Sequence, residues 1–197
     1  MYTVIGSVAS RAFRVVWMLE ELGQPYRIEP VKPRSDAVLA HSALGKIPVL
    51  LDGDVPINDS AAIMTYLADK HGALTAPAGT LARAQQDAMT FRILDELDAV
   101  IWTYARHSFV LPPDQRVPDV RPSLQAEFMR NLAAITRDIQ GPFVMGEAMT
   151  IPDILLVHCA NWARVAKFPT PDEAFLRYSK AVRARAAFGR TLAQRPD

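Results

Sequence analysis

The chain has 197 residues, half of them hydrophobic, and its 22 basic and 21 acidic side chains leave a formal net charge of +1. This length suits one large or two small domains with a sizeable apolar core. So small a charge excludes binding to a polyanion by phosphate neutralisation, and nucleic acid is therefore not an expected partner. No apolar stretch approaches the roughly 20 residues that span a bilayer. Residues 1–5 also lack the basic start and cleavage site of a signal peptide, so we expect no membrane association and a cytoplasmic location.

The single cysteine limits the redox and metal chemistry of the chain. Cys159 lies in an apolar run over residues 154–162, which predicts a buried core thiol. One cysteine excludes an internal disulfide and a Cys-x-x-Cys redox motif. None of His41, His71 and His158 has metal-ligand spacing with a carboxylate or thiol, so no metal site is predicted.

The first part of the chain alternates strand and helix patterns. Residues 2–5 predict a strand, residues 6–10 a turn of small side chains, and the apolar positions of residues 12–22 a helix that Gly23 ends. The further predicted elements are a strand at 26–31, a weak helix at 36–44, a hairpin of strands at 49–51 and 55–57, and a helix that Ser60 caps and Gly72 ends. A strand, a helix and a second strand this close together imply a right-handed parallel unit, and the whole order predicts a compact α/β domain.

After residue 80 the patterns are helical only. Residues 75–80 are small and contain proline and glycine, which predicts a linker. Helical patterns follow over residues 81–107 and 123–139, separated by a proline-rich segment at 112–122, and a last one covers residues 175–192. Thr150 and Asp153 have the spacing of a capping box, which predicts a buried helix from there.

Two segments separated by seven residues, 45–50 and 58–63, predict a site for a small peptide. Pro48 cannot donate to a sheet ladder, so we expect it at a strand's first residue or edge, with the backbone groups of Val49 free for an extended ligand. Asp59 and Ser60 stand at a helix start, where N–H donors and a hydroxyl suit a ligand carboxylate and the acidic group suits a ligand ammonium. The pattern predicts a receptor for a small zwitterionic peptide.

Four segments in this order resemble the glutathione transferase family. Residues 7–23 are similar to its first turn and helix, 45–50 to its cis-proline strand, 59–72 to its γ-glutamyl-binding helix and 150–162 to its capped core helix. The resemblance implies an α/β thioredoxin-like N-terminal domain (1–74), a linker (75–80) and an all-α C-terminal domain (81–197) that contributes an electrophile pocket. It also implies a homodimer that transfers the sulfur of glutathione, a co-substrate with no further cofactor, to an electrophilic carbon.

By position, the resemblance implies glutathione contacts at Lys46, Ile47, Pro48, Val49, Asp59 and Ser60. Lys46 and Val49 would contact the glycyl and cysteinyl parts, Pro48 would be cis, and the last two residues would hold the γ-glutamyl end. The sequence departs from the family at three places. It has Asp59 where glutamate or glutamine is commoner, no tyrosine at the end of the first strand, and no proline after Ser7, and the absent tyrosine favours a serine-type, bacterial-like class.

Glutathione attacks as its thiolate, and a free thiol is mostly protonated near neutral pH. A hydroxyl that donates to the sulfur beside the positive end of a helix stabilises the anion. Ser7 and Ser10 are both candidates for this donor, although Ser10 could instead be a helix N-cap and Ser7 a turn residue. Arg11 could reach the ligand's carboxylate or a dimer partner, or be solvated.

Tyr104, His107 and Phe109 follow the long helical pattern, near where the family's electrophile pocket opens. The resemblance implies that they line a pocket for a small hydrophobic electrophile, although a loop anchored on the core is the alternative. Two other functions stay open, a glutathione-binding or scaffold protein with little turnover and a glutathione-dependent reductase or peroxidase. The absence of cysteine from residues 1–80 counts against disulfide reduction.

Overall fold

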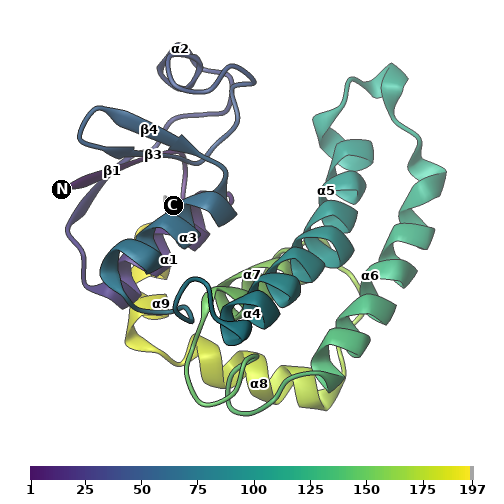
Figure 1. The fold of residues 1–197 in the computed structure, drawn as a ribbon. Coiled ribbons are helices and arrows are strands. Elements are labelled where there is room, and N and C mark those ends of the chain that lie inside the picture. The colour runs from purple at the N-terminus through teal and green to yellow at the C-terminus, as the bar shows by residue number, and fades with distance from the viewer. Residues whose placement is uncertain (196–197) are drawn as a thin grey trace. The chain divides into compact units, whose positions relative to one another are not determined.

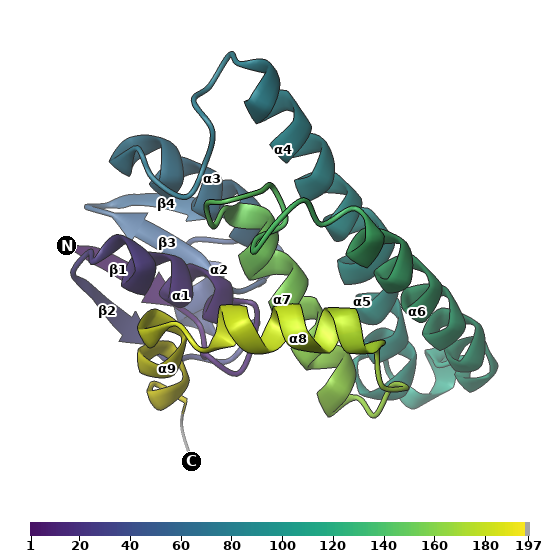
Figure 2. The same ribbon diagram turned by 90° about the horizontal axis from the view of Figure 1, so that it is seen from below.

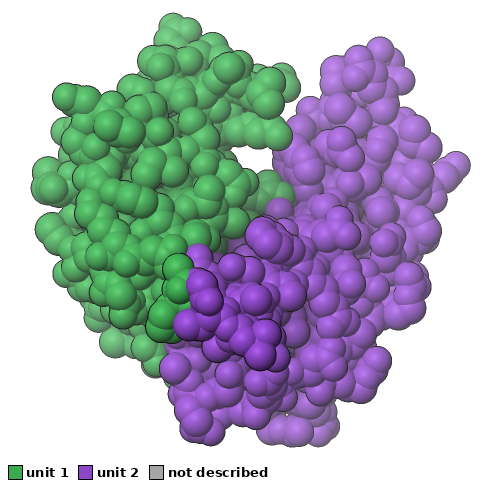
Figure 3. Space-filling model, in the orientation of Figure 1, with its two compact units in different colours: residues 1–78, 183–197 green, residues 79–182 purple. Residues whose placement is uncertain are grey.

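The computed structural model describes residues 1–195, which form two compact units. The first unit contains residues 1–78 and the C-terminal segment from residue 183, and the second contains residues 79–182 (Figures 1 and 3). The first unit holds the sheet and the second is helical. This confirms the predicted fold class, an α/β thioredoxin-like domain followed by an all-α domain.

The sheet of the first unit has four strands in the order β2-β1-β3-β4 (Figure 2). They are β1 (Tyr2–Ile5), β2 (Tyr26–Glu29), β3 (Val49–Asp52) and β4 (Val55–Asn58). β1 pairs in parallel with β2 and antiparallel with β3, and β3 pairs antiparallel with β4. Val4 and Leu50 are directly opposite in the central pair, and both are fully buried.

Four helices accompany this sheet: α1 (Ala12–Leu22), α2 (Asp36–Leu39), α3 (Ser60–His71) and α9 (Ala186–Ala193). α1 and α3 end as predicted, at Gly23 and Gly72, each with the positive φ that glycine adopts without steric cost. α2 is shorter than the predicted helix at 36–44. Its C-cap residue is Ala40, and turns fill the segment from there to Gly45.

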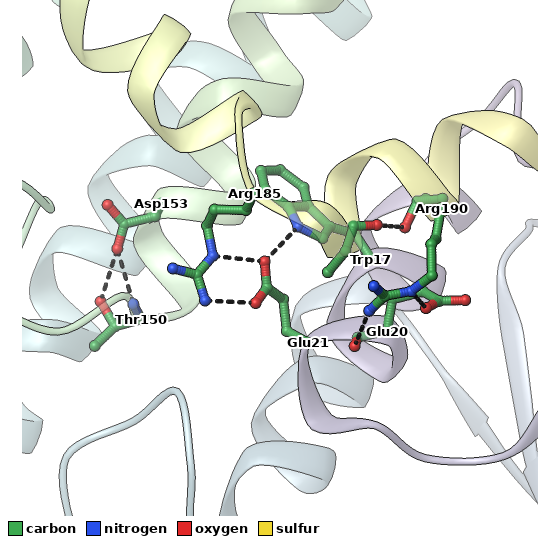
Figure 4. A network of polar contacts seen from close by, with 9 residues as sticks. Trp17, Glu20, Glu21, Thr150, Asp153, Arg185 and Arg190 are labelled. Carbon is green, nitrogen blue, oxygen red and sulfur yellow. Dashed lines mark hydrogen bonds and ion pairs between the residues drawn. The ribbon is translucent and has the colours of Figure 1, made fainter.

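The last predicted helix, at 175–192, is wrong, because the chain forms two helices there. α8 (Glu173–Arg183) and α9 are separated at Arg185, whose backbone is extended. The Arg185 guanidinium donates through Nε and Nη2 to the two carboxylate oxygens of Glu21 on α1, at 2.8 and 2.7 Å (Figure 4). Phe188 of α9 packs edge-on against Trp17 of α1, with ring centroids 5.0 Å apart. α9 therefore belongs to the first unit, whereas the sequence placed every residue after 80 in one helical domain.

The second unit begins with one long helical run over residues 81–110. It consists of α4 (Leu81–Ile93), the π-helical turn η1 (Leu94–Asp98), α5 (Ala99–Ala105) and a second π-helical turn η2 (Arg106–Val110). The proline-rich segment forms two short 3₁₀ turns, η3 (Pro113–Gln115) and η4 (Pro118–Val120), before α6 (Arg121–Arg137), which packs against α5 (Figure 1). Residues 79–182 contain no strand, only an isolated bridge between Phe143 and Gly146.

The capping box predicted at Thr150 is present at the start of α7 (Ile151–Val165). The Asp153 carboxylate accepts a hydrogen bond from the backbone N–H of Thr150 at 2.8 Å (Figure 4). It also accepts from the backbone N–H of Val144 at 2.8 Å and from the Tyr178 hydroxyl at 2.7 Å. Burial raises the pKa of Asp153 above its ordinary value, although these donors act in the opposite direction. Cys159 of α7 is buried, as predicted.

Within residues 1–195, no helix combines the length and the apolar character needed to cross a bilayer. The same residues contain no group of three or more His, Cys, Asp or Glu side chains placed to hold a metal ion.

Candidate functional site

The turn between β1 and α1 lies against Ile47. Gly6 has a φ of +133°, and a Cβ atom built on it would come within 2.9 Å of the Ile47 Cβ. Only glycine allows both this backbone conformation and this close approach. The structure thus brings the turn that carries Ser7 and Ser10 next to the segment that carries Pro48.

The two serines of this turn differ in what their hydroxyl groups do. The Ser10 hydroxyl donates to the Ser7 carbonyl oxygen at 2.6 Å and accepts from the Ala12 N–H at 3.1 Å. It therefore satisfies a backbone N–H at the start of α1 in the manner of a cap, although the N-cap residue of this helix is Arg11. The Ser7 hydroxyl oxygen accepts from the Ala9 N–H at 3.2 Å, and no acceptor among the described residues takes its proton. Ser7 is half-buried and keeps a hydroxyl proton that it can donate to a ligand.

The Ile47–Pro48 peptide bond is cis, as predicted. The expected free edge at Val49 is wrong, because β3 is an inner strand: Val49 faces Ile5 of β1 on one side and Asn58 of β4 on the other. A proline removes only its own donor, so it does not decide where its strand lies in the sheet. The free backbone groups that were expected at Val49 are found at Ile47, the residue before the proline. Its N–H and C=O have no hydrogen-bond partner within the described residues.

A loop stabilised by hydrogen bonds carries Lys46. Gly45 has a φ of +60°, and its carbonyl oxygen accepts from the Arg34 N–H at 2.9 Å. The Lys46 N–H donates to the Ser42 hydroxyl at 3.2 Å, while its side chain is exposed. A flexible ammonium group is thus fixed at its base and open to solvent at its tip.

The cap of α3 is Asp59, and the prediction that Ser60 caps this helix is wrong. One carboxylate oxygen of Asp59, Oδ1, accepts from the N–H groups of Ala61 at 2.8 Å and Ala62 at 3.1 Å. Asp59 has a φ of +73°, a conformation that side chains other than glycine and asparagine rarely adopt and that is common at functional sites. Its Oδ2 has no partner within residues 1–195 and can accept from a ligand ammonium.

The capping arrangement leaves Ser60 with two donors. Asp59 satisfies the next two N–H groups of α3, but the N–H of Ser60 itself has no hydrogen-bond partner in the described part of the chain. The Ser60 hydroxyl oxygen accepts from Nη1 of Arg14 at 3.2 Å, a contact buried between α1 and α3. Arg14 was missed in the sequence, where a basic residue in an amphipathic helix normally indicates a solvated position.

The three residues expected in an electrophile pocket lie on and near the second π-helical turn. Tyr104 is one of six residues that line a cavity of about 420 Å³ in the second unit, together with Pro118, Asp119, Arg121, Pro122 and Gln125. Nδ1 of His107 accepts from the Val117 N–H at 3.1 Å, so this side chain anchors the proline-rich loop. Phe109 is 65% exposed.

Comparison with known proteins relates the first part of the chain to a known family. Residues 10–70 match the family model of the glutathione S-transferase N-terminal domain. The chain is also 46% identical over 68 residues to Glutathione S-transferase 3 of Schizosaccharomyces pombe, a match that covers 32% of this chain and 28% of that relative's length. The predicted resemblance to the glutathione S-transferase family is thus confirmed for the N-terminal segment, residues 10–70.

Solved glutathione transferases share the fold over almost the whole chain. Gtt2 from Saccharomyces cerevisiae has a TM-score of 0.85 at 20% identity, with 96% of this chain and 99% of that one covered. A glutathione transferase family member from Pseudomonas fluorescens Pf-5, solved with two glutathione molecules bound, has a TM-score of 0.80 at 23% identity, with 97% and 92% covered. The transferase fold therefore extends beyond the matched N-terminal segment.

Proposed function

We propose that this protein is a serine-type glutathione transferase, in which Ser7 stabilises the glutathione thiolate for attack on a small hydrophobic electrophile. The observation that carries the proposal is the uncommitted hydroxyl proton of Ser7 in the turn before α1. The partial positive charge at the start of this helix favours an anion there, and a hydrogen bond from a hydroxyl to a charged sulfur favours it further. Each unit by which the thiol pKa falls corresponds to about 1.4 kcal/mol.

The other contacts of glutathione follow from the groups left open in the first unit. The backbone of Ile47, beside the cis Pro48, pairs with the extended cysteinyl part. Lys46 meets the glycyl carboxylate, Ser60 donates to the γ-glutamyl carboxylate, and Oδ2 of Asp59 accepts from the γ-glutamyl ammonium. The presence of bound glutathione in the structure from Pseudomonas fluorescens Pf-5 supports this choice of ligand.

The electrophile is assigned to the second unit. We place it near Tyr104, which lines the cavity described above, with Phe109 as an exposed apolar contact. His107 acts by holding the loop. The protein acts as a homodimer, which the exposed apolar side chains of Leu81 and Phe91 on α4 support, and sedimentation at micromolar concentration tests this state.

The test compares Ser7→Ala with Ser10→Ala in a conjugation assay with glutathione and a chromogenic aryl chloride. Ser7→Ala should raise the pKa of the bound thiol and lower turnover at neutral pH, while glutathione affinity stays within a few-fold. Ser10→Ala should lower the unfolding free energy by roughly 1 kcal/mol through the lost cap and retain most activity. If Ser10→Ala silences a stable enzyme and Ser7→Ala is harmless, the sulfur donor is Ser10. Tight glutathione binding by the wild type without conjugation would instead favour the binding or scaffold protein.

A further inference from the structure

The cavity of the second unit is lined by both apolar and hydrogen-bonding side chains. Its volume of about 420 Å³ is large enough for a substituted benzene ring, and Pro118 and Pro122 offer such a ring apolar surface. The ring of Tyr104 packs edge-on against Phe168, with ring centroids 4.7 Å apart, which fixes the position of this part of the wall. A small aromatic molecule therefore fits the cavity, and the polar residues of its wall decide which substituents are favoured.

Three side chains of the cavity wall carry hydrogen-bond donors that the rest of the described chain does not use. Arg121 and Gln125 are four residues apart on α6 and so lie on the same face of that helix. Within residues 1–195 the Arg121 guanidinium donates only from Nε, to the Pro118 carbonyl oxygen at 3.2 Å, so Nη1 and Nη2 are without a partner. The Gln125 amide and the Tyr104 hydroxyl have no hydrogen-bond partner in the same residues. A wall with several unused donors suits an oxyanion.

The two charges of the wall differ in how strongly they act on a ligand. Arg121 is half-buried and held at its Nε, and it has no ion-pair partner among the described residues. Asp119 also lines the cavity, but it is exposed, and solvent and salt screen an exposed charge. The guanidinium also presents two parallel N–H groups that match the two oxygens of a carboxylate. The positive charge of Arg121 therefore outweighs the negative charge of Asp119 for a ligand in the cavity.

We propose that the electrophile is an aromatic carboxylate and that Arg121 binds its carboxylate in this cavity, with Gln125 and Tyr104 as further donors. The inference rests on the proposed function and adds the substrate class, since the ring remains the apolar part and the carboxylate orients it. For an aryl chloride the thiolate sulfur forms a bond to the ring carbon that carries chlorine. The carbon–chlorine bond breaks, chloride leaves with the electron pair, and the proton lost by the thiol goes to solvent.

The experiment compares two activated aryl chlorides, 4-chloro-3,5-dinitrobenzoate and its methyl ester, as substrates for conjugation with glutathione. Each kcat/KM is divided by the uncatalysed rate constant of the same compound, because the ester is intrinsically more reactive. The wild type should prefer the acid by about tenfold or more. Arg121→Gln should remove most of this preference. Asp119→Asn should increase it by about twofold, since it removes an exposed negative charge from the same wall.

Arg130→Gln is the matched control, because Arg130 lies on the same helix, is exposed and does not line the cavity. It should keep the wild-type preference. A second readout needs no turnover: calorimetry measures the binding of 3,5-dinitrobenzoate and of its methyl ester, which lack the leaving group. The same variants should change the ratio of the two affinities in the same directions. The advantage of the acid should also shrink as the salt concentration is raised.

A wild type that treats acid and ester alike would overturn the inference. So would an Arg121→Gln variant that keeps the wild-type preference, or one that loses no more of it than Arg130→Gln does, because the effect would then come from the net charge of the protein. If the wild type conjugates neither compound, the proposed function is wrong, and the binding ratio still decides whether Arg121 holds a carboxylate. Failure of the function and failure of the inference are therefore distinguishable.

Circular dichroism shows whether each variant folds. If Arg121→Gln does not fold, a crystal structure of the wild type with 3,5-dinitrobenzoate decides. A carboxylate on the Arg121 guanidinium supports the inference, and a carboxylate bound elsewhere overturns it.

Discussion

Replacement of Asp153 by alanine should be among the most destabilising single changes in the second unit. The carboxylate accepts from the N–H groups of Val144 and Thr150 and from the Tyr178 hydroxyl, at 2.7 to 2.8 Å, and all of these contacts are buried. In Asp153→Ala the three donors lose their acceptor, and a buried unpaired donor costs about 1–3 kcal/mol. With partial relaxation of the neighbours we expect a loss of about 3–6 kcal/mol, a large part of the ordinary stability of about 5–15 kcal/mol.

Urea unfolding followed by circular dichroism measures this loss, with the slope of the transition checked for two-state behaviour. Two variants remove one group each and serve as controls. Tyr178→Phe removes a donor together with its hydrogen bond, and Thr150→Ala removes only the hydroxyl, so each should cost about 1 kcal/mol. If Asp153→Ala costs no more than Tyr178→Phe, the carboxylate does not organise the start of α7 and our reasoning is wrong.

Four further predictions concern charge, capping, backbone and packing. Because burial raises the pKa of Asp153, the wild type should gain stability over Asp153→Asn as the pH falls from neutral through that raised value, which urea unfolding across this range measures. Asp59→Asn keeps an oxygen for the cap of α3 and loses the negative charge, so glutathione affinity by calorimetry should fall while the melting temperature changes little. Gly45→Ala should destabilise the Lys46 loop, seen as faster amide exchange there, because the new Cβ would lie 2.8 Å from the Arg34 Cα at a φ of +60°. Phe188→Ala should release α9 at lower urea than the sheet, since its ring packs on Trp17.

Three results would contradict these in turn. They are a constant difference between the wild type and Asp153→Asn over the whole pH range, unchanged glutathione affinity in Asp59→Asn, and exchange rates in Gly45→Ala equal to those of the wild type. For Phe188→Ala, a single transition at the wild-type midpoint would show that α9 contributes nothing to the first unit.

Features that depend on neighbouring residues could be predicted from the sequence. Gly23 and Gly72 end their helices because glycine adopts the left-handed backbone conformation of a C-cap without steric cost. The capping box is visible in the sequence because Thr150 and Asp153 are three residues apart. The hairpin of β3 and β4 was visible in the Asp-Gly-Asp turn. In each case the residues that decide the structure lie within one turn of each other.

Features that depend on distant segments could not be predicted. Val49 is enclosed because β1 enters between β2 and β3, and a strand's own residues do not record which strands lie beside it. Asp59 and Ser60 are both good capping residues, and Asp59 is the cap because its carboxylate accepts from the N–H groups of Ala61 and Ala62. Arg14 is buried because its partner lies on another helix. Propensity and periodicity predict single helices and strands, whereas these three features depend on how the helices and strands pack against one another.

At some residues of the candidate site a substitution should affect ligand binding alone, and at others it should affect stability as well. Ser10, Asp59 and Gly45 each satisfy backbone groups or a close approach, so changes there alter stability as well as any ligand contact. Within residues 1–195 the Ser7 hydroxyl accepts one hydrogen bond, from the Ala9 N–H at 3.2 Å, and donates none, so its removal costs the fold little. The Ser7 hydroxyl lies in a turn that requires Gly6 at a φ of +133°, and the fold does not depend on the hydroxyl. Its removal should therefore lower turnover before it lowers stability. Ser7 is therefore the residue at which a loss of turnover without a loss of stability is most informative about function.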